Sequence, residues 1–139
     1  MASSIEGKIT AGLLEHFALL ALPAGTKVAQ PGINFTPESG KPFISLEVHH
    51  NTPVDVDIAM ETDPIRRGFM RANVFWPSGQ GVIKATDLAA LIAEHFGRGL
   101  RITFEGVTIW IIDSPELAGD IQATTHFSIP VTIRWQVYP

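Results

Sequence analysis

The chain has 139 residues, of which 45% are hydrophobic and 17% are charged, as in one globular domain with a sizeable core. Its net charge of −4 and its single basic pair, Arg66-Arg67, argue against nucleic acid as the main partner. The absence of cysteine excludes disulfides, thiolate nucleophiles and cysteine-based metal sites. No secretory signal and no apolar run of ~18 residues is visible, so we expect a protein made in the cytoplasm and not bound to a membrane.

The first predicted element is a helix near residues 4–21. Ser3 and Glu6 form a capping-box pattern, in which the Ser3 hydroxyl accepts from the Glu6 amide and the Glu6 side chain reaches back. Pro23 and Gly25 are expected to end this helix. Its apolar stripe comprises Ile5, Ile9, Leu13, Phe17 and Leu20.

A short apolar piece at residues 27–30 and a strand at residues 43–48 follow. Residues 51–68 are the longest stretch without a sustained period, although Val54 and Val56 begin an alternation. Such a stretch is typical of a hairpin arm or an extended loop. We expect this arm to be flexible in the isolated subunit and ordered on assembly.

Residues 69–96 predict a strand, a turn and a helix in succession. The strand has an apolar residue at every second position, which is typical of a strand with one buried face. These residues are Met70, Ala72, Val74 and Trp76. Pro77 ends it, and Ser78–Gly81 supplies turn residues. The helix near residues 82–96 has an apolar stripe that we expect to face the core. This stripe comprises Ala85, Leu88, Ala89, Ile92 and Phe96.

The last third predicts a hairpin around Glu105-Gly106, a turn region at residues 115–120 and a long strand at residues 126–137. The hairpin strands are residues 100–104 and 107–112. Pro130 cannot donate to a ladder, so the long strand is expected to lie at an edge or to carry a bulge. The order of elements predicts an α+β fold, a single domain over residues 1–139 with two helices packed on a mostly antiparallel mixed sheet.

The Gly79–Gly81 turn leaves one binding hypothesis open. It lies between a strand and a helix, where dinucleotide fingerprints occur, and helix N-termini favour anions. However, Lys84 occupies the position of the third glycine, and the phosphate-loop pattern also fails. A structural turn is the favoured interpretation, and a small nucleotide- or anion-binding module is the alternative.

The sequence shows no catalytic or metal-binding constellation. His49 and His50 are neighbours in a predicted strand, so they point to opposite faces, and the five histidines include no H-x-x-x-H spacing. The arm contains an acidic cluster of Asp55, Asp57, Glu61 and Asp63. This cluster lacks the ligand order of an EF-hand, which favours a solvated loop. We expect no enzymatic activity, no metal and no cofactor.

Several segments along the chain share one arrangement with a known family. They are Ala21-Leu22-Pro23 through Val28-Ala29, Gly40-Lys41-Pro42-Phe43, Gly68, Val74 through Gly81, His95-Phe96 and Ile129-Pro130-Val131. In this arrangement the chain resembles the tail-terminator-like proteins of tailed bacteriophages, which include minor tail proteins of the lambda type. Residues 51–67 have no counterpart in the resemblance.

The resemblance implies a structural protein of a phage or prophage virion tail, without catalytic residues. Proteins of that family form rings, typically hexameric, that cap the growing tail tube, stop its polymerisation and present a surface to the head. The implied partners are other copies of the chain, the tail tube protein and a head–tail connector protein. Mixed charge makes the arm the expected interface. Its candidate contact residues are Asp55, Asp57, Glu61, Arg66 and Arg67.

Overall fold

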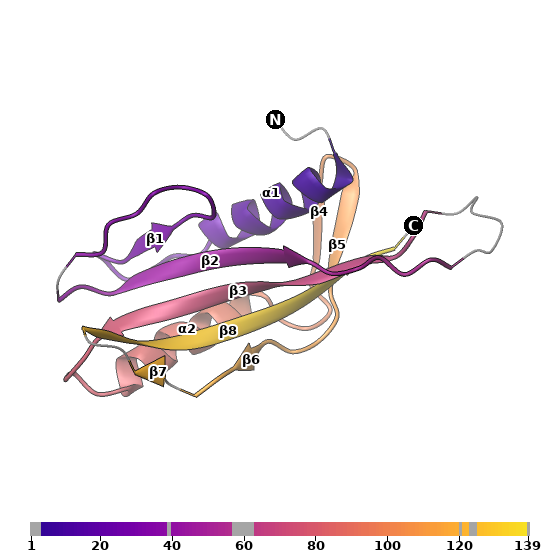
Figure 1. Ribbon diagram of the computed structural model, residues 1–139. Helices are drawn as coiled ribbons and strands as arrows, with labels where there is room; N and C mark the ends of the chain where they lie inside the picture. The colour runs from indigo at the N-terminus through magenta and orange to yellow at the C-terminus, as the bar shows by residue number, and fades with distance from the viewer. Residues whose placement is uncertain (1–3, 39, 57–62, 120, 123–124, 139) are drawn as a thin grey trace.

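The computed structural model describes residues 4–38, 40–56, 63–119, 121–122 and 125–138 (Figure 1). These residues form two helices, α1 (Ile5–Ala18) and α2 (Ile83–His95), and one sheet of eight strands. The strands are β1 (Lys27–Ala29), β2 (Phe43–His50), β3 (Arg66–Pro77), β4 (Arg101–Phe104), β5 (Val107–Ile111), β6 (Glu116–Leu117), β7 (Ile121–Gln122) and β8 (His126–Val137). All described pairs are antiparallel except β1 with β2, which confirms the predicted α+β fold with a mixed sheet.

The strand order is β1-β2-β3-β8-β5-β4, and β6 and β7 pair with β8 as well. Helix α1 contacts β4 and β5, while α2 contacts β3, β8 and β6. Both helices lie on the same face of the sheet; in Figure 1, α2 lies behind β3 and β8, and α1 lies above β2. The opposite face of β2, β3 and β8 carries no helix in the described part of the chain. We call it the open face.

The predicted apolar stripes form the core between the helices and the sheet. In α2, the whole predicted stripe is buried. In α1, Ile9, Leu13 and Phe17 are buried, and Ile5 and Leu20 pack against the core at its margin. Their partners in the sheet are the inward residues of β2, β3, β5 and β8, including Met70, Val74, Ile109, Ile133 and Trp135. The period-two and helical patterns therefore predicted the buried faces correctly.

The two ends of α1 differ from the sequence prediction. Ser3 lies outside the described residues, and the Ser4 side chain is the cap, because its hydroxyl accepts from Gly7 N at 3.0 Å. At the other end the helix stops at Ala18, earlier than predicted. The last turn tightens there, since Leu19 N and Leu20 N donate to the carbonyls three residues back.

The prediction that β8 lies at an edge or is bulged at Pro130 is wrong. Strand β8 is central, and its register with β3 runs unbroken from Arg66 opposite Val137 to Pro77 opposite His126. The N–H and C=O of one strand residue point to the same side. The Pro130 carbonyl accepts from Ala118 N, so the Pro130 nitrogen, which has no hydrogen to donate, faces the same side. On that side lies the segment between β6 and β7, where the ladder that pairs with β8 is interrupted.

The arm begins as a continuation of the β2–β3 hairpin. Asn51 N donates to Arg67 O at 2.9 Å, and Val54 and Ile65 form an antiparallel bridge. Part of the stretch predicted as an arm or loop is thus sheet, because β3 starts at Arg66 and includes Gly68. Residues 57–62 lie outside the described residues, so the expectation of flexibility for them stays a prediction.

The hairpin turn at Glu105-Gly106 is confirmed, and both residues have positive φ, +46° and +84°. That pair of dihedrals matches the twist of a two-residue antiparallel turn. The region 115–120, predicted as a turn, instead contains β6, which pairs with Thr132 and Val131 of β8.

Gly68 allows β3 to approach β2 and β8 closely. A Cβ at this position would overlap the His49 carbonyl oxygen and would lie 2.6 Å from Trp135 Cζ2. The Trp135 side chain is fully buried, so neither neighbour can move without disturbing the core.

We expect Gly68→Ala to lower the free energy of unfolding by at least about 1–3 kcal/mol, the usual cost of overpacking. The matched control is Gly119→Ala, whose added Cβ meets nothing within 4 Å. Urea titration of both variants tests this. Equal stability of the two would show that the sheet tolerates a side chain at residue 68.

We expect Leu88→Ala and Ile92→Ala each to cost about 2–5 kcal/mol, because both side chains leave a cavity under α2. Asp87→Ala, on the exposed side of the same helix, is the control and should change stability by less than about 0.5 kcal/mol. Denaturant titration measures all three. A loss below ~0.5 kcal/mol at both core sites would contradict the packing described here.

Candidate assembly surface

The base of the arm is fixed to the start of α1. Arg66 Nε donates to Glu6 Oε2 at 3.1 Å, and His50 Nε2 lies 3.0 Å from Thr10 Oγ1. The His50 ring also packs edge-on against Trp135, with ring centroids 5.2 Å apart. The first turns of the helix thereby set the direction in which the β2–β3 ribbon leaves the sheet.

Charge and burial at this junction shift two ionisable groups. A hydrogen bond from its own backbone N–H and one from Arg66 hold the pKa of the Glu6 carboxyl below its usual value. Burial lowers the pKa of His50 below its ordinary value of 6.5. Near neutral pH, Glu6 is therefore charged and paired, while His50 is largely neutral.

The structure separates the residues that the sequence grouped as one interface. Arg66 is mostly covered, with 19% of its side chain exposed, and it is paired within its own subunit. Arg67 is exposed and comes from the open face, and Asp55 is exposed on the arm. Asp57 and Glu61 lie outside the described residues. Arg66 thus has a role within the subunit, and the others remain candidates for contact with partners.

The open face is only half exposed, because aromatic and charged side chains pack along it. Phe43 of β2 stacks on Phe75 of β3 at 4.5 Å, and His49 stacks on Phe69 at 4.6 Å. The Arg71 guanidinium lies 5.0 Å from the centre of the Phe69 ring. Such a surface is suited to protein contact, since aromatic residues and arginine are enriched at interface centres.

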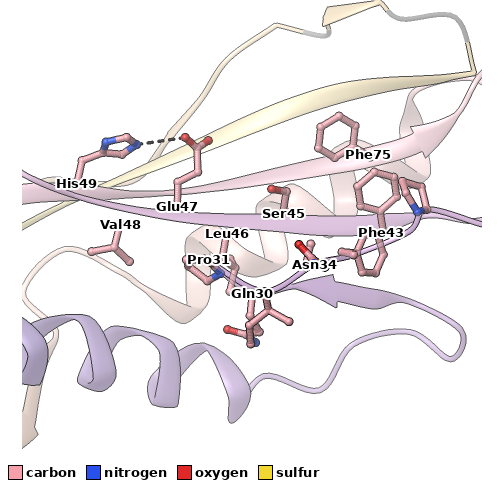
Figure 2. Close-up of a pocket in the computed structure, with 15 residues that line it drawn as sticks. Gln30, Pro31, Asn34, Phe43, Ser45, Leu46, Glu47, Val48, His49 and Phe75 are labelled. Carbon is pink, nitrogen blue, oxygen red and sulfur yellow. Dashed lines mark hydrogen bonds and ion pairs between the residues drawn. The ribbon is translucent and has the colours of Figure 1, made fainter. Parts of the chain in front are cut away.

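A hollow of about 650 Å³ lies along β2 beside residues 30–37. Figure 2 shows the Glu47–His49 pair at one end of it and the rings of Phe43 and Phe75 at the other. Asn73 Nδ2 donates to Glu47 Oε2 at 2.8 Å. Burial opposes ionisation of Glu47, but the hydrogen bonds from Asn73 and His49 outweigh it and lower the pKa of this carboxyl. The described groups bind and stack, with no nucleophile–base arrangement among them.

Helices α1 and α2 are joined near their C-termini by a reciprocal pair of histidines, which we call the histidine clasp. His16 Nε2 donates to the His95 carbonyl at 3.0 Å, and His95 Nε2 donates to the His16 carbonyl at 2.6 Å. The rings stack at 4.1 Å, and Phe96 packs edge-on against both. Because carbonyls only accept, both rings carry a proton on Nε2.

The Gly79–Gly81 turn has the positive φ angles that favour glycine, +90° and +77°. Its residues are exposed, and none of them lines the hollow beside β2. The strand after α2 belongs to an antiparallel hairpin, so in the described residues this turn is not followed by the parallel crossover of a dinucleotide site. Anion binding at this turn stays a prediction without further support.

Within the described residues, no group of three or more His, Asp or Glu side chains is placed to hold a metal ion. Of the described helices, neither is long and apolar enough to cross a membrane.

Comparison with known proteins identifies the family. Residues 8–135 match the family described as phage tail terminator protein. The chain belongs to this family. One solved structure shares 21% identity with it at a TM-score of 0.79, with 99% of each chain covered. A chain from the virion of a native gene transfer agent particle shares 13% identity at a TM-score of 0.67, with 99% of this chain and 100% of that chain covered. No curated protein matches the chain significantly.

As a member of the phage tail terminator family, the protein is a structural component of a phage tail and assembles with other tail components. The two solved structures establish that the whole α+β fold is shared, at identities where only the fold can be compared. The α+β fold and the tail-terminator resemblance inferred from the sequence are both confirmed.

Sequence reasoning missed the histidine clasp and the paired state of Arg66. His16 and His95 are 79 residues apart, and each lies beside the apolar stripe of its own helix, which was the one signal in the sequence that they face the same core. The Glu6–Arg66 pair depends on the base of the hairpin lying beside the first turn of α1, and no local sequence pattern encodes that proximity. A third histidine, His126, is buried and donates to the Lys41 carbonyl at 2.8 Å.

The histidine clasp is expected to make the free energy of unfolding of this tail terminator family member depend on pH. Burial lowers the pKa of His16 below its ordinary value of 6.5, so the unfolded chain binds more protons near that pH. The stability from neutral His16 is therefore fully present above pH 6.5 and is lost as pH falls from there through the lowered pKa of the folded state. We expect the urea midpoint to fall between pH 7.5 and 5.5.

The variant His16→Gln tests the source of this dependence. It should show a smaller fall in midpoint than the wild type over the same interval, with His50 supplying the remainder. The carboxyls with lowered pKa values titrate at lower pH and do not contribute to this window. A wild-type midpoint that stays constant from pH 7.5 to 5.5 would contradict the assignment.

Proposed function

We propose that this protein is a ring-forming tail terminator, which caps the tail tube, stops its polymerisation and joins the tail to the head. The observation that carries the proposal is the family match over residues 8–135, nearly the whole chain. The partners proposed are further copies of the chain, the tail tube protein and a head–tail connector protein. The protein would be made in the host cytoplasm and would then become part of the virion tail.

The geometry supports a ring because the subunit presents two different surfaces. One is the arm that continues the β2–β3 ribbon, and the other is the open face of the sheet. A closed ring of identical subunits needs a heterologous interface, in which each copy offers one surface and receives another. Six copies of 15.1 kDa would give an assembly of about 91 kDa.

The decisive measurement combines the purified protein, its cognate tube protein and electron microscopy. We expect tubes of restricted length, each with one ring-shaped density at an end, because a bound ring removes the surface to which tube subunits add. Tube protein alone is the control and should give tubes of unregulated length. If tubes grow equally long with the protein present, and it never appears at their ends, the proposed function is wrong.

A further inference from the structure

The excess negative charge of this protein is concentrated in residues 51–65, the part of the arm before Arg66, which we call the acidic arm. Residues 51–65 contain four of the 14 acidic residues and none of the ten Lys and Arg. The remainder of the chain therefore has ten acidic and ten basic residues and no formal net charge. Those four acidic residues are Asp55, Asp57, Glu61 and Asp63. The arm is an acidic projection on an otherwise balanced molecule.

The described part of the arm points away from its own subunit. The Asn51–Arg67 hydrogen bond and the Val54–Ile65 bridge extend the β2–β3 ladder beyond the end of the sheet, as Figure 1 shows. Asp55 and Asp63 are both exposed there. A ribbon held in register by its ladder extends away from the sheet, so Asp55 and Asp63 are accessible to another molecule.

The open face carries arginines that match this charge. Two adjoining hollows of about 240 and 420 Å³ lie over β8, between β3 on one side and the β5–β6 segment on the other. Both are lined by Phe69 and Arg134, and they also include Arg67 and Arg71, respectively. We call these two hollows together the arginine groove.

The arginines of the groove follow a regular spacing. Arg134 lies opposite Phe69, so it stands midway between Arg67 and Arg71 along β3. The backbone positions of the three arginines are therefore spaced along the strand direction by two-residue steps, each about 6.6–6.8 Å. Asp55 and Asp63, the two acidic residues of the described part of the arm, flank the Val54–Ile65 bridge and offer carboxylates to such a row of arginines.

The groove retains hydrogen-bonding capacity for an acidic partner. Arg71 Nε is buried and has no partner among the described residues. Arg134 donates one Nη1 bond to Glu116, an exposed pair of the kind that contributes about 0–1 kcal/mol, and its other donors can meet an incoming carboxylate. Arginine binds carboxylates in pairs of parallel hydrogen bonds, which gives position as well as affinity.

We propose that the acidic arm of one copy docks in the arginine groove of a neighbouring copy. The contact is heterologous, as ring closure requires, because arm and groove are different surfaces of the same chain. This inference rests on the proposed ring and specifies the contact that joins its subunits.

Charge reversal on each side tests the contact. The groove variant carries Arg67→Glu and Arg134→Glu, and the arm variant carries Asp55→Lys and Asp63→Lys. Arg71 is left unchanged because it packs on Phe69. Sedimentation at rising protein concentration, with and without tube ends, measures self-association. We expect each variant to associate at least about 100-fold more weakly than the wild type, because like charges then face each other.

The two variants should rescue each other. In an equimolar mixture, each Lys-bearing arm meets a Glu-bearing groove and each native arm meets a native groove, so assembly should return to within about tenfold of the wild type. A chain carrying all four substitutions should recover alone. The matched control reverses two exposed charges elsewhere, Asp87→Lys with Arg98→Glu, and should assemble as the wild type does. Thermal unfolding of every variant separates lost assembly from lost folding.

Other outcomes overturn the contact in distinguishable ways. If the reversed variants assemble normally, or if the mixture does not recover, the arm does not dock in this groove, although the terminator function stands. If rings form but the arm variant no longer reaches tube ends, the arm binds the tube protein instead. If the wild type neither self-associates nor appears at tube ends, the proposed function fails and the contact fails with it.

Discussion

The pairing of β3 with β8 is the constraint on which the rest of the structure depends. Twelve residues of each strand stay in one register, from Arg66 opposite Val137 to Pro77 opposite His126. A slip of one residue would exchange the inward Met70 and Ile133 for the outward Arg71 and Arg134. The same register therefore builds the core under the helices and places the arginines on the open face, so stability and surface chemistry cannot change independently here.

Much of the fold could be predicted because its signals are local. The alternation in residues 69–76 and 126–137 and the apolar stripe of α2 each identified a buried face, and the structure buries them. Pro130 misled the prediction because proline lacks the backbone N–H that would donate to a neighbouring strand. A proline is nevertheless tolerated in a central strand where the neighbouring strand has no acceptor opposite it. Here the gap between β6 and β7 removes the conflict. That gap is a tertiary feature, and the proline alone cannot show it.

The candidate surface was less predictable because its parts come from distant segments. Charge in the arm suggested an interface, yet the sequence could not show that Arg66 pairs with Glu6 across α1. Nor could it show that Arg134 would stand opposite Phe69, between two arginines of β3. The histidine clasp is similar, since its two residues meet only where the C-terminal ends of the two helices approach each other. The sequence shows where the charged residues lie along the chain, but only the register of β3 and β8 shows which of them lie side by side.

A ring held by arm and groove would have energetics suited to a cap. Exposed ion pairs contribute little individually and are screened by salt, so free subunits in dilute solution would associate weakly. At a tube end, several copies bind one platform, and the effective concentration of each arm near its neighbour's groove rises without any new contact. Assembly would then be favoured where a tube exists and disfavoured elsewhere. The low charge of the remaining surface and its half-buried aromatic residues would serve the contacts with the tube and the head.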